Sequence, residues 1–563
     1  MENACSRRDF VRNAATVAVG AAGAAAVLNA VPAKADEAAV PAWMPEKWDY
    51  ECDVLVIGYG GAGMWAACTA SDEGAEVLVL EKAPIRGGGS SSMNCGQWTY
   101  PGDADAAATY AYQAFHGYTP MEMCQAWADE AVQNGDYADD YGFDWELFNN
   151  GEARCEYAGL FDGSDQMIVA DVKGNGPAFF ETMDQNVKDR GIEVLFDCHD
   201  ESLIQNTETG EIVGCYTKMG AEDTLYAVKA RKGVIMTCGG FEFNEELKTK
   251  YLKCYPMRGF YGWKYNTGDG IKMCQRVGAD LRSMGLVMGG WNAWFNDPEI
   301  VPGGVSVSAP AASFIWVNSL GKRWRDDSLF VPHGGWKIFT NFNEDVCNYD
   351  RIPSWAIFDQ ACFDAGPWGD MVGGLGPDNG GMDVGYMSSN LPDELGHWAG
   401  WSSDNKWELE RGWIKKGDTL DELVEVMNAY DEGAPNMTVE DLQATIDRYN
   451  HFCEIGEDQD FGRSAESAGG AGGAGGLSPL QGPPFYAIPI YPGLGNTLGG
   501  PARNPKAEIV DCDGNAIGRL YGAGSFCNMA SHTYAITGGN NSENWCWGRI
   551  AGRNCAALED WDA

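Results

Sequence analysis

The chain has 563 residues and a formal net charge of −42 at pH 7, with 81 Asp and Glu against 39 Lys and Arg. A surface this acidic repels the phosphate backbone, which argues against nucleic acid as a partner, although it favours docking to a basic protein. The length is sufficient for two domains with large cores.

The 18 cysteines are scattered, and no two of them have CxxC spacing. This pattern argues against a zinc site or a ferredoxin-type cluster, and Cys198-His199 lacks the earlier cysteine that a covalent haem motif needs. We therefore expect no metal and no built-in electron carrier. The thiols are either free, as in a protein from an anoxic habitat, or paired in disulfides that the sequence does not reveal.

The amino terminus has the pattern of an export signal. The pair Arg7-Arg8 precedes an alanine-rich apolar stretch, and Ala33-Lys34-Ala35 offers a small-x-small cleavage site. We expect residues 1–35 to be a twin-arginine signal peptide that delivers the folded protein to the periplasm or to the outer face of the cytoplasmic membrane. An uncleaved membrane anchor is the alternative.

The first chemical motif follows an apolar strand at residues 54–57. The strand breaks into a GxGxxG pattern at Gly58, Gly60 and Gly63. Gly58 permits a tight turn, Gly60 lets the backbone approach a pyrophosphate, and Gly63 lets the next helix pack close to the strand. Ala62, inside the same turn, is expected to contact the phosphates as well.

A second apolar strand, at residues 77–80, ends in Glu81, eighteen residues past Gly63. A carboxylate at this position binds a ribose diol and repels a 2′-phosphate. Lys82 follows it and is expected at the same site. Strand, glycine turn, helix, second strand and acid together indicate a dinucleotide site in a Rossmann-like fold.

A second loop of small residues follows, from Arg86 to Gly96. It is placed to wrap a pyrophosphate and the ribityl side of a flavin. With this loop the chain resembles the flavoprotein superfamily of fumarate reductase and succinate dehydrogenase, and the resemblance implies FAD as the cofactor. The loop residues expected to bind it are Gly88, Gly89, Ser90, Ser91 and Gly96.

Three later segments extend the resemblance in the order that the superfamily has them. Residues 234–241 resemble its returning strand and ATGGF turn, residues 267–270 its TGDG helix start, and residues 518–524 its GLYAAG strand and turn. The resemblance adds Cys238, Gly239, Asp269 and Gly524 to the residues expected to bind FAD.

The resemblance also implies the fold class. We expect an α/β fold in which a Rossmann-like FAD-binding domain of the glutathione-reductase type carries an inserted α+β substrate cap domain. The cap is expected to end with a helix through Arg448, the segment 460–463 and a Gly-rich linker at 469–476. The expected boundaries are 49–290 for the first part of the FAD-binding domain, 291–476 for the cap with its linker, and 477–563 for the second part of the FAD-binding domain.

The residues that bind a dicarboxylate in fumarate reductases are missing. Gly495-Asn496 stands where those enzymes carry a histidine pair, Ile536 precedes the last Thr-Gly-Gly segment, and Val331 stands where the superfamily has its proton-donating arginine. A dicarboxylate would lose several charge-assisted hydrogen bonds, each worth about 1.5–3 kcal/mol. Fumarate and succinate are therefore poor substrate candidates.

The carboxyl-terminal part instead resembles the ketosteroid dehydrogenase branch, through PPFYA at 483–487 and SHTYAITG at 531–538. By that resemblance, the Tyr534 hydroxyl and the Gly538 amide bind a substrate carbonyl. Such a pair suits hydride transfer to the carbon β to a carbonyl, because negative charge develops on the oxygen. Packing beneath the flavin is the alternative role for Tyr534. Three further residues expected to bind the flavin are Gly539, Asn540 and Asn541.

The proton-transfer group is not fixed by the resemblance, because the steroid branch has a second tyrosine where this chain has Val331. His333, two residues on, and Tyr157, in a loop where that branch carries another active-site tyrosine, are the candidates. Either one is alternatively a residue with only a structural role.

These observations predict an exported FAD-dependent oxidoreductase that acts on the C–C bond next to the carbonyl of a bulky, apolar enone. We expect the reductive direction in anaerobic respiration, with a separate cytochrome or quinol-linked donor. The alternatives are a dicarboxylate reductase with a rebuilt site and an electron-transfer flavoprotein without small-molecule turnover. Tryptophans expected either to form a flat aromatic cleft or to pack in the core are Trp291, Trp294, Trp316 and Trp324.

Overall fold

The computed structural model describes residues 41–221, 223–259, 262–297, 304–328, 333–369, 401–430, 436–464 and 475–563. The predicted signal peptide, most of the Gly-rich linker and Val331 lie outside these ranges. Residues 45–563 form one compact unit, which contains every element described below. A search of the described helices finds none that is long and apolar enough to span a membrane.

Eight strands form the first sheet, whose central part has the order β21-β22-β9-β1-β2-β6. The neighbours from β22 to β6 are parallel, whereas β21, β8 and β7 are attached by antiparallel pairing. The strands are β1 (Tyr50–Ile57), β2 (Val77–Leu80), β6 (Glu193–Leu195), β7 (Cys198–Gln205), β8 (Ile212–Met219), β9 (Leu225–Met236), β21 (Glu508–Val510) and β22 (Ala516–Gly522).

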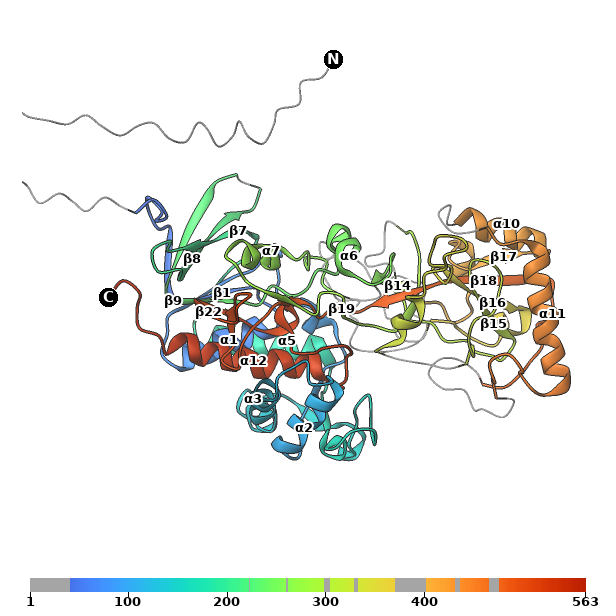
Figure 1. Ribbon diagram of the computed structural model, residues 1–563, viewed down its shortest axis with the longest axis horizontal. Helices are drawn as coiled ribbons and strands as arrows, with labels where there is room; N and C mark the ends of the chain where they lie inside the picture. Colours follow the sequence, from blue (N-terminus) through green and yellow to red (C-terminus); the bar gives the residue numbers. More distant parts are fainter. Residues whose placement is uncertain are drawn as a thin grey trace, which may run out of the picture. The chain divides into compact units, whose positions relative to one another are not determined.

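Both faces of this sheet are covered, which explains why β1 is apolar without alternation. Val54 and Val56 pack in the core formed with α1 and α12, while Leu55 and Ile57 pack in a second core with α7. The helices around the sheet (Figure 1) are α1 (Gly61–Asp72), α5 (Asn175–Asp189), α7 (Asp269–Arg276) and α12 (Gly539–Ala556). The predicted α/β class is confirmed.

Helices α1 and α12 pack against each other through small residues. A Cβ on Gly548 would lie 2.8 Å from the Ala62 carbonyl oxygen, and one on Gly552 would lie 2.7 Å from that of Ala66. Both contacts advance by four residues, so the helices run in the same direction. Their amino-terminal ends therefore lie at the same edge of the sheet.

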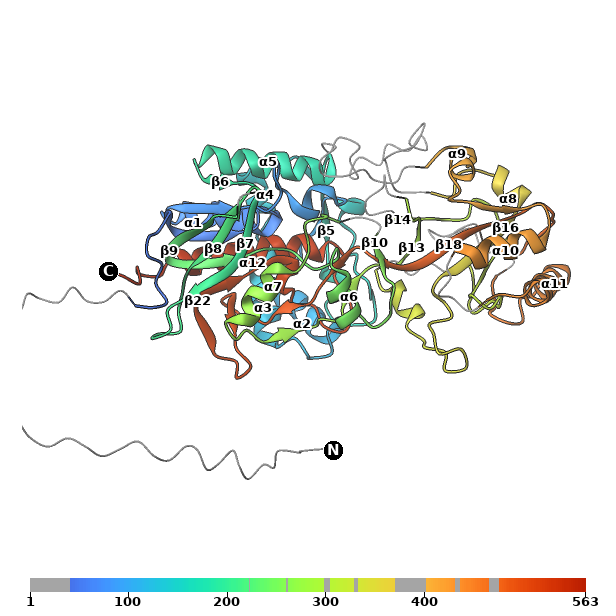
Figure 2. The same cartoon turned by 90° about the horizontal axis from the view of Figure 1, so that it is seen from above.

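A second sheet of seven strands has the order β14-β13-β18-β16-β15, with β10 and β17 also paired to β18. Figures 1 and 2 show β18 as a long orange strand running through this sheet. The strands are β10 (Arg258–Gly259), β13 (Trp291–Trp294), β14 (Gly304–Val305), β15 (Phe314–Val317), β16 (Ser354–Asp359), β17 (Lys415–Gly417) and β18 (Phe485–Leu494).

Strand β18 lies in the part of the chain that was expected to rejoin the FAD-binding domain at residue 477. β18 pairs over six residues with β16, a strand of the expected cap, and also pairs with β13. The end of β18 also pairs with β10, which lies in the expected first part of the FAD-binding domain. Beyond β18, β19 (Asn496–Thr497) pairs with β12 (Val287–Met288) of the same expected part. The domain boundaries themselves remain predictions.

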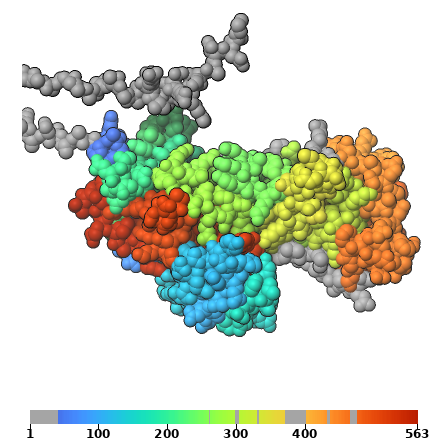
Figure 3. All heavy atoms as spheres, in the orientation of Figure 1, coloured from blue at the N-terminus to red at the C-terminus, as the bar shows by residue number. Residues whose placement is uncertain are grey.

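Smaller elements complete the described chain. A three-stranded sheet joins β3, β5 and β4, and β11 pairs with β20. In Figure 3, α2, α3 and the loop after them protrude as blue and cyan atoms. These elements are α2 (Ala104–Ala114), α3 (Met121–Ala131), α4 (Asn134–Asp140), α6 (Glu245–Tyr251), α8 (Gln360–Asp364), α9 (Lys406–Glu410), α10 (Leu420–Tyr430), α11 (Val439–Ile455), β3 (Gln97–Thr99), β4 (Trp145–Leu147), β5 (Val169–Val172), β11 (Leu281–Arg282) and β20 (Gly500–Pro501).

The cysteines and acidic residues of the described ranges form no cross-link or metal cluster. Every cysteine there is a free thiol, and most are buried. Burial raises the pKa of several of these thiols, Cys52 and Cys68 among them, to about 12. In the same ranges, no three His, Cys, Asp or Glu side chains gather closely enough to hold a metal ion.

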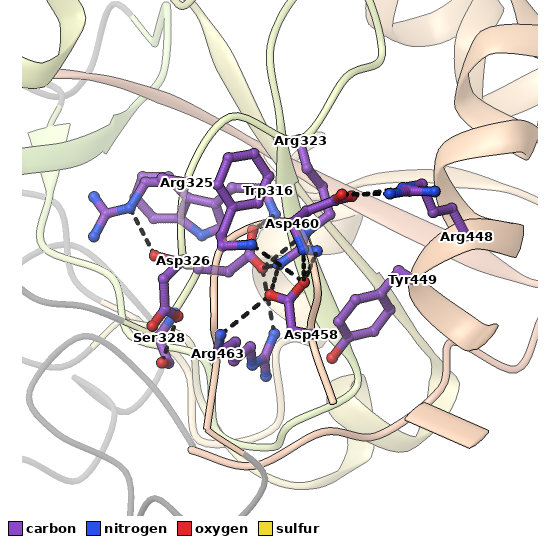
Figure 4. Close-up of polar contacts among 12 residues, drawn as sticks. Trp316, Arg323, Arg325, Asp326, Ser328, Arg448, Tyr449, Asp458, Asp460 and Arg463 are labelled. Carbon is purple, nitrogen blue, oxygen red and sulfur yellow. Dashed lines mark hydrogen bonds and ion pairs between the residues drawn. The ribbon is translucent and has the colours of Figure 1, made fainter. Parts of the chain in front are cut away.

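A buried ion network holds the cap together (Figure 4). Arg323 lies between Asp327, at 2.5 Å, and Asp458, at 2.9 Å. Arg463 lies 3.6 Å from Asp327 and donates to the carbonyl oxygens of Phe314, Ala312 and Gly476. These links join β15, the segment after it and the turn that follows α11, so the segment 460–463 has a clear structural role.

We predict that Arg463→Leu destabilises the protein by about 3–5 kcal/mol, because it leaves buried carboxylates and carbonyl groups without a partner. The matched control is Arg448→Leu. Arg448 also forms an ion pair, with Asp460, but its side chain is largely exposed. Thermal unfolding of the holoenzyme variants should show a clear drop in Tm for the first and almost none for the second. Equal Tm values would contradict the structural role of the network.

Candidate functional site

The turn between β1 and α1 has the geometry that its glycines predict. Gly58 has φ +106°, and a Cβ there would lie 2.6 Å from the Thr237 carbonyl oxygen. A Cβ on Gly63 would overlap the Gly58 carbonyl oxygen, so Gly63 permits the close packing of helix on strand. Gly60 differs, because the nearest atom to its Cβ position is 3.9 Å away.

The amino-terminal end of α1 is open to a ligand. No side chain caps it at Gly60, and Gly60, Gly61 and Ala62 line a cavity of about 1070 Å³ that is partly open to solvent. The first N–H groups of a helix lack intrahelical partners and carry a partial positive charge. This end of α1 therefore suits the phosphates of a dinucleotide.

Glu81 lies at the carboxyl end of β2 and lines the same cavity. Its two carboxylate oxygens accept hydrogen bonds of 2.8 Å from the N–H groups of Tyr59 and Ala83. Burial raises the pKa of this carboxyl group, although the two hydrogen bonds oppose that effect. Each oxygen keeps a second lone pair, so the group can still accept from a ribose diol.

Lys82 joins the two predicted motifs at this end of the cavity. Its ammonium group lies 2.5 Å from the Thr267 hydroxyl and 2.6 Å from the Asp269 carboxylate. Burial alone would raise the pKa of Asp269, but the hydrogen bonds from Lys82 and Thr267 hold it below its usual value. The strand-end acid and the TGDG segment are therefore tied together.

The second glycine loop, residues 86–96, lies alongside the first one, residues 58–63. The Gly88 N–H donates to the Tyr59 carbonyl oxygen over 2.7 Å, and Gly60 and Gly88 form an isolated parallel bridge. The Ser90 hydroxyl accepts from the backbone of Trp263 and the side chain of Asn266, each over 3.2 Å. This arrangement brings both loops to one cavity.

The cavity contains most of the residues expected to bind the cofactor. Four expected residues do not line it and shape the backbone around it instead, namely Gly63, Gly88, Gly96 and Gly539. Those that line it are Gly58, Gly60, Ala62, Glu81, Lys82, Gly89, Ser90, Ser91, Cys238, Gly239, Asp269, Gly524, Asn540 and Asn541.

Helix α12 also begins at this cavity. The Asn540 amide donates to Asn496 over 2.8 Å, while its buried Oδ1 atom has no partner among the described residues. Asn541 exchanges hydrogen bonds with Asn94, and Asn544 donates to Ser91 over 3.0 Å. The first turns of α12 therefore present amide groups to the cavity.

Several lining residues were missed by the sequence analysis. Asp200 on β7 has a buried Oδ1 without a partner among the described residues, and burial raises its pKa to about 7. It lies in no motif. Asn544 could have been predicted, because it lies four residues after Asn540 and therefore on the same face of the same helix. Other missed lining residues are Asn94, Trp263, Tyr265, Asn266 and Ser525.

The predicted carbonyl-binding pair lies at the amino-terminal end of α12. The Tyr534 hydroxyl is buried and accepts from the Asn540 N–H over 3.4 Å, and no acceptor for its own hydrogen is found in the described ranges. Burial raises the pKa of Tyr534, and Glu156 adds to that effect. Gly538 precedes the helix with φ +71°, and its N–H likewise has no partner among the described residues.

The two candidates for proton transfer both lie against the segment of Tyr534. The His333 ring is 5.0 Å from the Tyr534 ring, and its Nδ1 atom is 2.7 Å from a carboxylate oxygen of Glu156. The Tyr157 hydroxyl forms a 2.8 Å hydrogen bond with the Thr533 hydroxyl. Glu156 is a further residue that the sequence analysis missed.

The cap tryptophans pack in the interior. Trp291 and Trp316 are buried with their rings 5.2 Å apart, and Arg325 lies over the Trp291 ring. Trp294 and Trp324 are partly buried against the same core. Of the two expectations for these residues, the structure favours core packing over an open aromatic cleft.

Three observations indicate that the cavity can accommodate FAD. Space is open at Gly60, a helix end faces it without a side-chain cap, and buried oxygen atoms of Asp200 and Asn540 point to missing partners. Glu81 would hold the adenosine ribose of FAD, and the α1 end would hold its pyrophosphate. Asn496 and the start of α12, which line the same cavity, would hold the flavin, whose chemistry is hydride transfer.

We predict that Gly60→Val abolishes FAD retention without unfolding the chain, because its Cβ position meets no protein atom closer than 3.9 Å. Gly60→Ala should weaken retention less. The measurement is the ratio of flavin to protein absorbance after purification, with circular dichroism as the control for folding. A yellow Gly60→Val protein at wild-type stoichiometry would contradict the cofactor site.

Comparisons with known proteins agree with this site. The chain is 27% identical to a digoxin reductase of Eggerthella lenta, with 100% of this chain and 99% of that protein covered. It is 25% identical to a 3-oxosteroid 1-dehydrogenase of Mycolicibacterium smegmatis, with 90% and 97% covered. Each of these names belongs to the relative and not to this chain.

Solved structures show the same fold. A 3-ketosteroid Δ1-dehydrogenase of Sterolibacterium denitrificans aligns with a TM-score of 0.69 at 19% identity, over 90% of this chain and 99% of that one. A flavocytochrome c3 fumarate reductase in an open conformation aligns with a TM-score of 0.62 at 22% identity, over 90% and 78%.

The family assignment rests on a match along most of the chain. The model of the FAD binding domain family matches residues 53–542, which include both glycine loops and the start of α12. The chain therefore belongs to the FAD binding domain family and is an FAD-dependent oxidoreductase that acts on carbon–carbon bonds.

Proposed function

We propose that the protein reduces a C=C bond conjugated to a carbonyl, in a bulky and apolar substrate, with hydride supplied by the reduced cofactor. The observation that carries this proposal is the pair of donors at the α12 end. The Tyr534 hydroxyl and the Gly538 N–H have no acceptor within the described chain and lie beside a residue of the cofactor cavity.

These two donors suit the charge that the reaction creates. When the β-carbon gains hydride, negative charge develops on the carbonyl oxygen, and two preorganised donors stabilise the resulting enolate. The amino-terminal end of α12 adds a favourable partial charge. Relatives named for digoxin and for 3-oxosteroids support a bulky substrate.

Dicarboxylates fit this site less well. Asn496 and Ile536 are buried. By the resemblance, these are the positions at which fumarate reductases carry charged groups. Neither can neutralise a carboxylate, whereas a neutral carbonyl needs only hydrogen-bond donors.

Of the two proton-transfer candidates, we assign the proton donor to His333. Tyr157 is already hydrogen bonded to Thr533. His333 uses Nδ1 for Glu156, and its Nε2 has no partner in the described ranges. Its side chain is 33% exposed, which allows exchange of the proton with solvent.

The cellular setting belongs to the same proposal. The twin-arginine pattern at Arg7-Arg8 supports export of the folded, FAD-loaded protein. An exported enzyme has no access to cytoplasmic nicotinamide donors, which supports a membrane or periplasmic donor, cytochrome or quinol-linked. The organic substrate would then be the terminal electron acceptor.

The test is Tyr534→Phe, which removes one donor and keeps the ring. Reoxidation of the reduced flavin by an enone should slow by about 10²-fold or more, the usual cost of losing one oxyanion donor. Reduction of the flavin by an artificial donor should be unchanged, because that half-reaction forms no enolate. The matched control is Tyr521→Phe, a buried tyrosine on β22. A loss below about threefold with Tyr534→Phe would return this residue to a packing role.

Export has its own test. Changing Arg7→Lys together with Arg8→Lys should leave the protein in the cytoplasm with the signal attached, because the twin-arginine pathway reads the arginine pair. Cell fractionation and the mass of the mature chain measure the outcome. Normal export of the double variant would show that the apolar segment acts as an ordinary secretory signal.

A further inference from the structure

Glu156 connects the proposed proton donor to the loop that carries Tyr534. One oxygen of its carboxylate lies 2.7 Å from Nδ1 of His333 and accepts from the Thr537 hydroxyl over 3.1 Å. Its backbone N–H donates to the Ala535 carbonyl oxygen over 3.3 Å. The carboxylate is therefore fixed from two sides, while its side chain is only 14% exposed.

The charge state of Glu156 follows from these contacts. Burial raises its pKa, but the hydrogen bond and charge of His333, together with the Thr537 hydroxyl and the charge of Arg154, bring the pKa below its usual value. The group is therefore a carboxylate at neutral pH. A carboxylate on Nδ1 fixes the tautomer of an imidazole and stabilises its protonated form.

We propose that Glu156 is a positioning residue for proton transfer, which holds the Nδ1–H of His333 and stabilises the imidazolium so that Nε2–H protonates the substrate. This inference rests on the proposed function. It assigns a role to a residue that lies in none of the sequence motifs and that touches neither the cofactor cavity nor the expected carbonyl donors.

The proposed step is balanced in atoms and electrons. The β-carbon gains a C–H bond from the hydride supplied by the reduced cofactor. The electron pair of the C=C bond forms the double bond between the α-carbon and the carbonyl carbon, and the π pair of the carbonyl group moves to its oxygen. The α-carbon of this enolate then takes the proton from Nε2 of His333, which becomes neutral and is reprotonated from solvent. Glu156 remains a carboxylate throughout, and the two electrons come from the external donor.

Other titratable groups of the described chain also interact with this pair. Tyr534 packs against the His333 ring, Tyr157 follows Glu156, and Arg154 acts on Glu156 through its charge. Tyr110 and Cys155 interact with the charge of Glu156, and Cys95 interacts with Tyr534 and Arg154. Glu156→Gln also removes the effect of the Glu156 charge on Tyr534, so the signal of His333 is measured separately from turnover.

The first measurement follows the imidazole directly, without turnover. The chain has six histidines, so the Cε1–H signals of histidine-labelled holoenzyme can be followed by NMR, and His333→Gln identifies the signal of His333. At a fixed neutral pH we expect the His333 signal of Glu156→Gln to move away from its wild-type position, because Nδ1 loses the carboxylate that lies 2.7 Å away. An unchanged signal would overturn the proposal.

The second measurement is the pH profile of flavin reoxidation by an enone. In Glu156→Gln the profile should be displaced toward lower pH than in the wild type, because a protonated proton donor loses its anionic partner. On the alkaline side of the profile the variant should be about tenfold slower. Glu156→Asp keeps the charge and should restore part of the wild-type profile. This variant provides the test if Glu156→Gln does not retain FAD.

The matched control is Glu152→Gln in the same segment. Glu152 is exposed and accepts only from the Asn149 amide in the described ranges, over 3.0 Å. It should leave both the His333 signal and the pH profile unchanged. Wild-type reoxidation by an enone, together with identical profiles for the wild type and Glu156→Gln, would overturn this inference alone. Absence of enone reoxidation in the wild type would overturn the proposed function instead.

Discussion

The parallel packing of α1 on α12 is the constraint on which the site depends. The two helices come from opposite ends of the sequence, and Gly548 and Gly552 let them approach until a Cβ would touch the α1 carbonyl oxygens of Ala62 and Ala66. Because the helices run in the same direction, both amino-terminal ends face one cavity. In the proposed function, one end would bind the pyrophosphate and the other would bind the flavin and the substrate carbonyl.

The same constraint explains how the catalytic candidates meet. The segment before α12 carries Tyr534 and ends at Gly538, so fixing the helix also fixes the expected carbonyl donors. Hydrogen bonds from Glu156 and Tyr157 to this segment attach the loop that follows β4, and His333 is then held through Glu156. A network of three distant segments is thus built on one helix end.

The sequence was most informative where the determinants are local. The apolar run of β1, the positive φ of Gly58 and the packing of Gly63 are properties of a few adjacent residues, and the predicted turn agrees with the structure. Pairing of β18 with β16 depends instead on a partner more than a hundred residues away, so the register of this sheet could not be predicted from the sequence.

Side chains outside any motif were also beyond prediction. Glu156 is adjacent to the predicted Tyr157, yet its partner His333 is 177 residues away, and only the folded chain brings the two together. Asp200 reaches the cavity because β7 is attached to the sheet through β8, a topology with no sequence signature. Residues of this kind are found by their burial and missing partners.

Anaerobic reoxidation of the dithionite-reduced holoenzyme, followed through the flavin absorbance, tests the central claim most directly. A panel of enones, unsaturated acids and fumarate offers acceptors that differ in whether a neutral carbonyl or a carboxylate must be bound. We predict rapid reoxidation by an enone and none by fumarate. Rapid reoxidation by fumarate, or by a redox protein when no organic acceptor works, would contradict it.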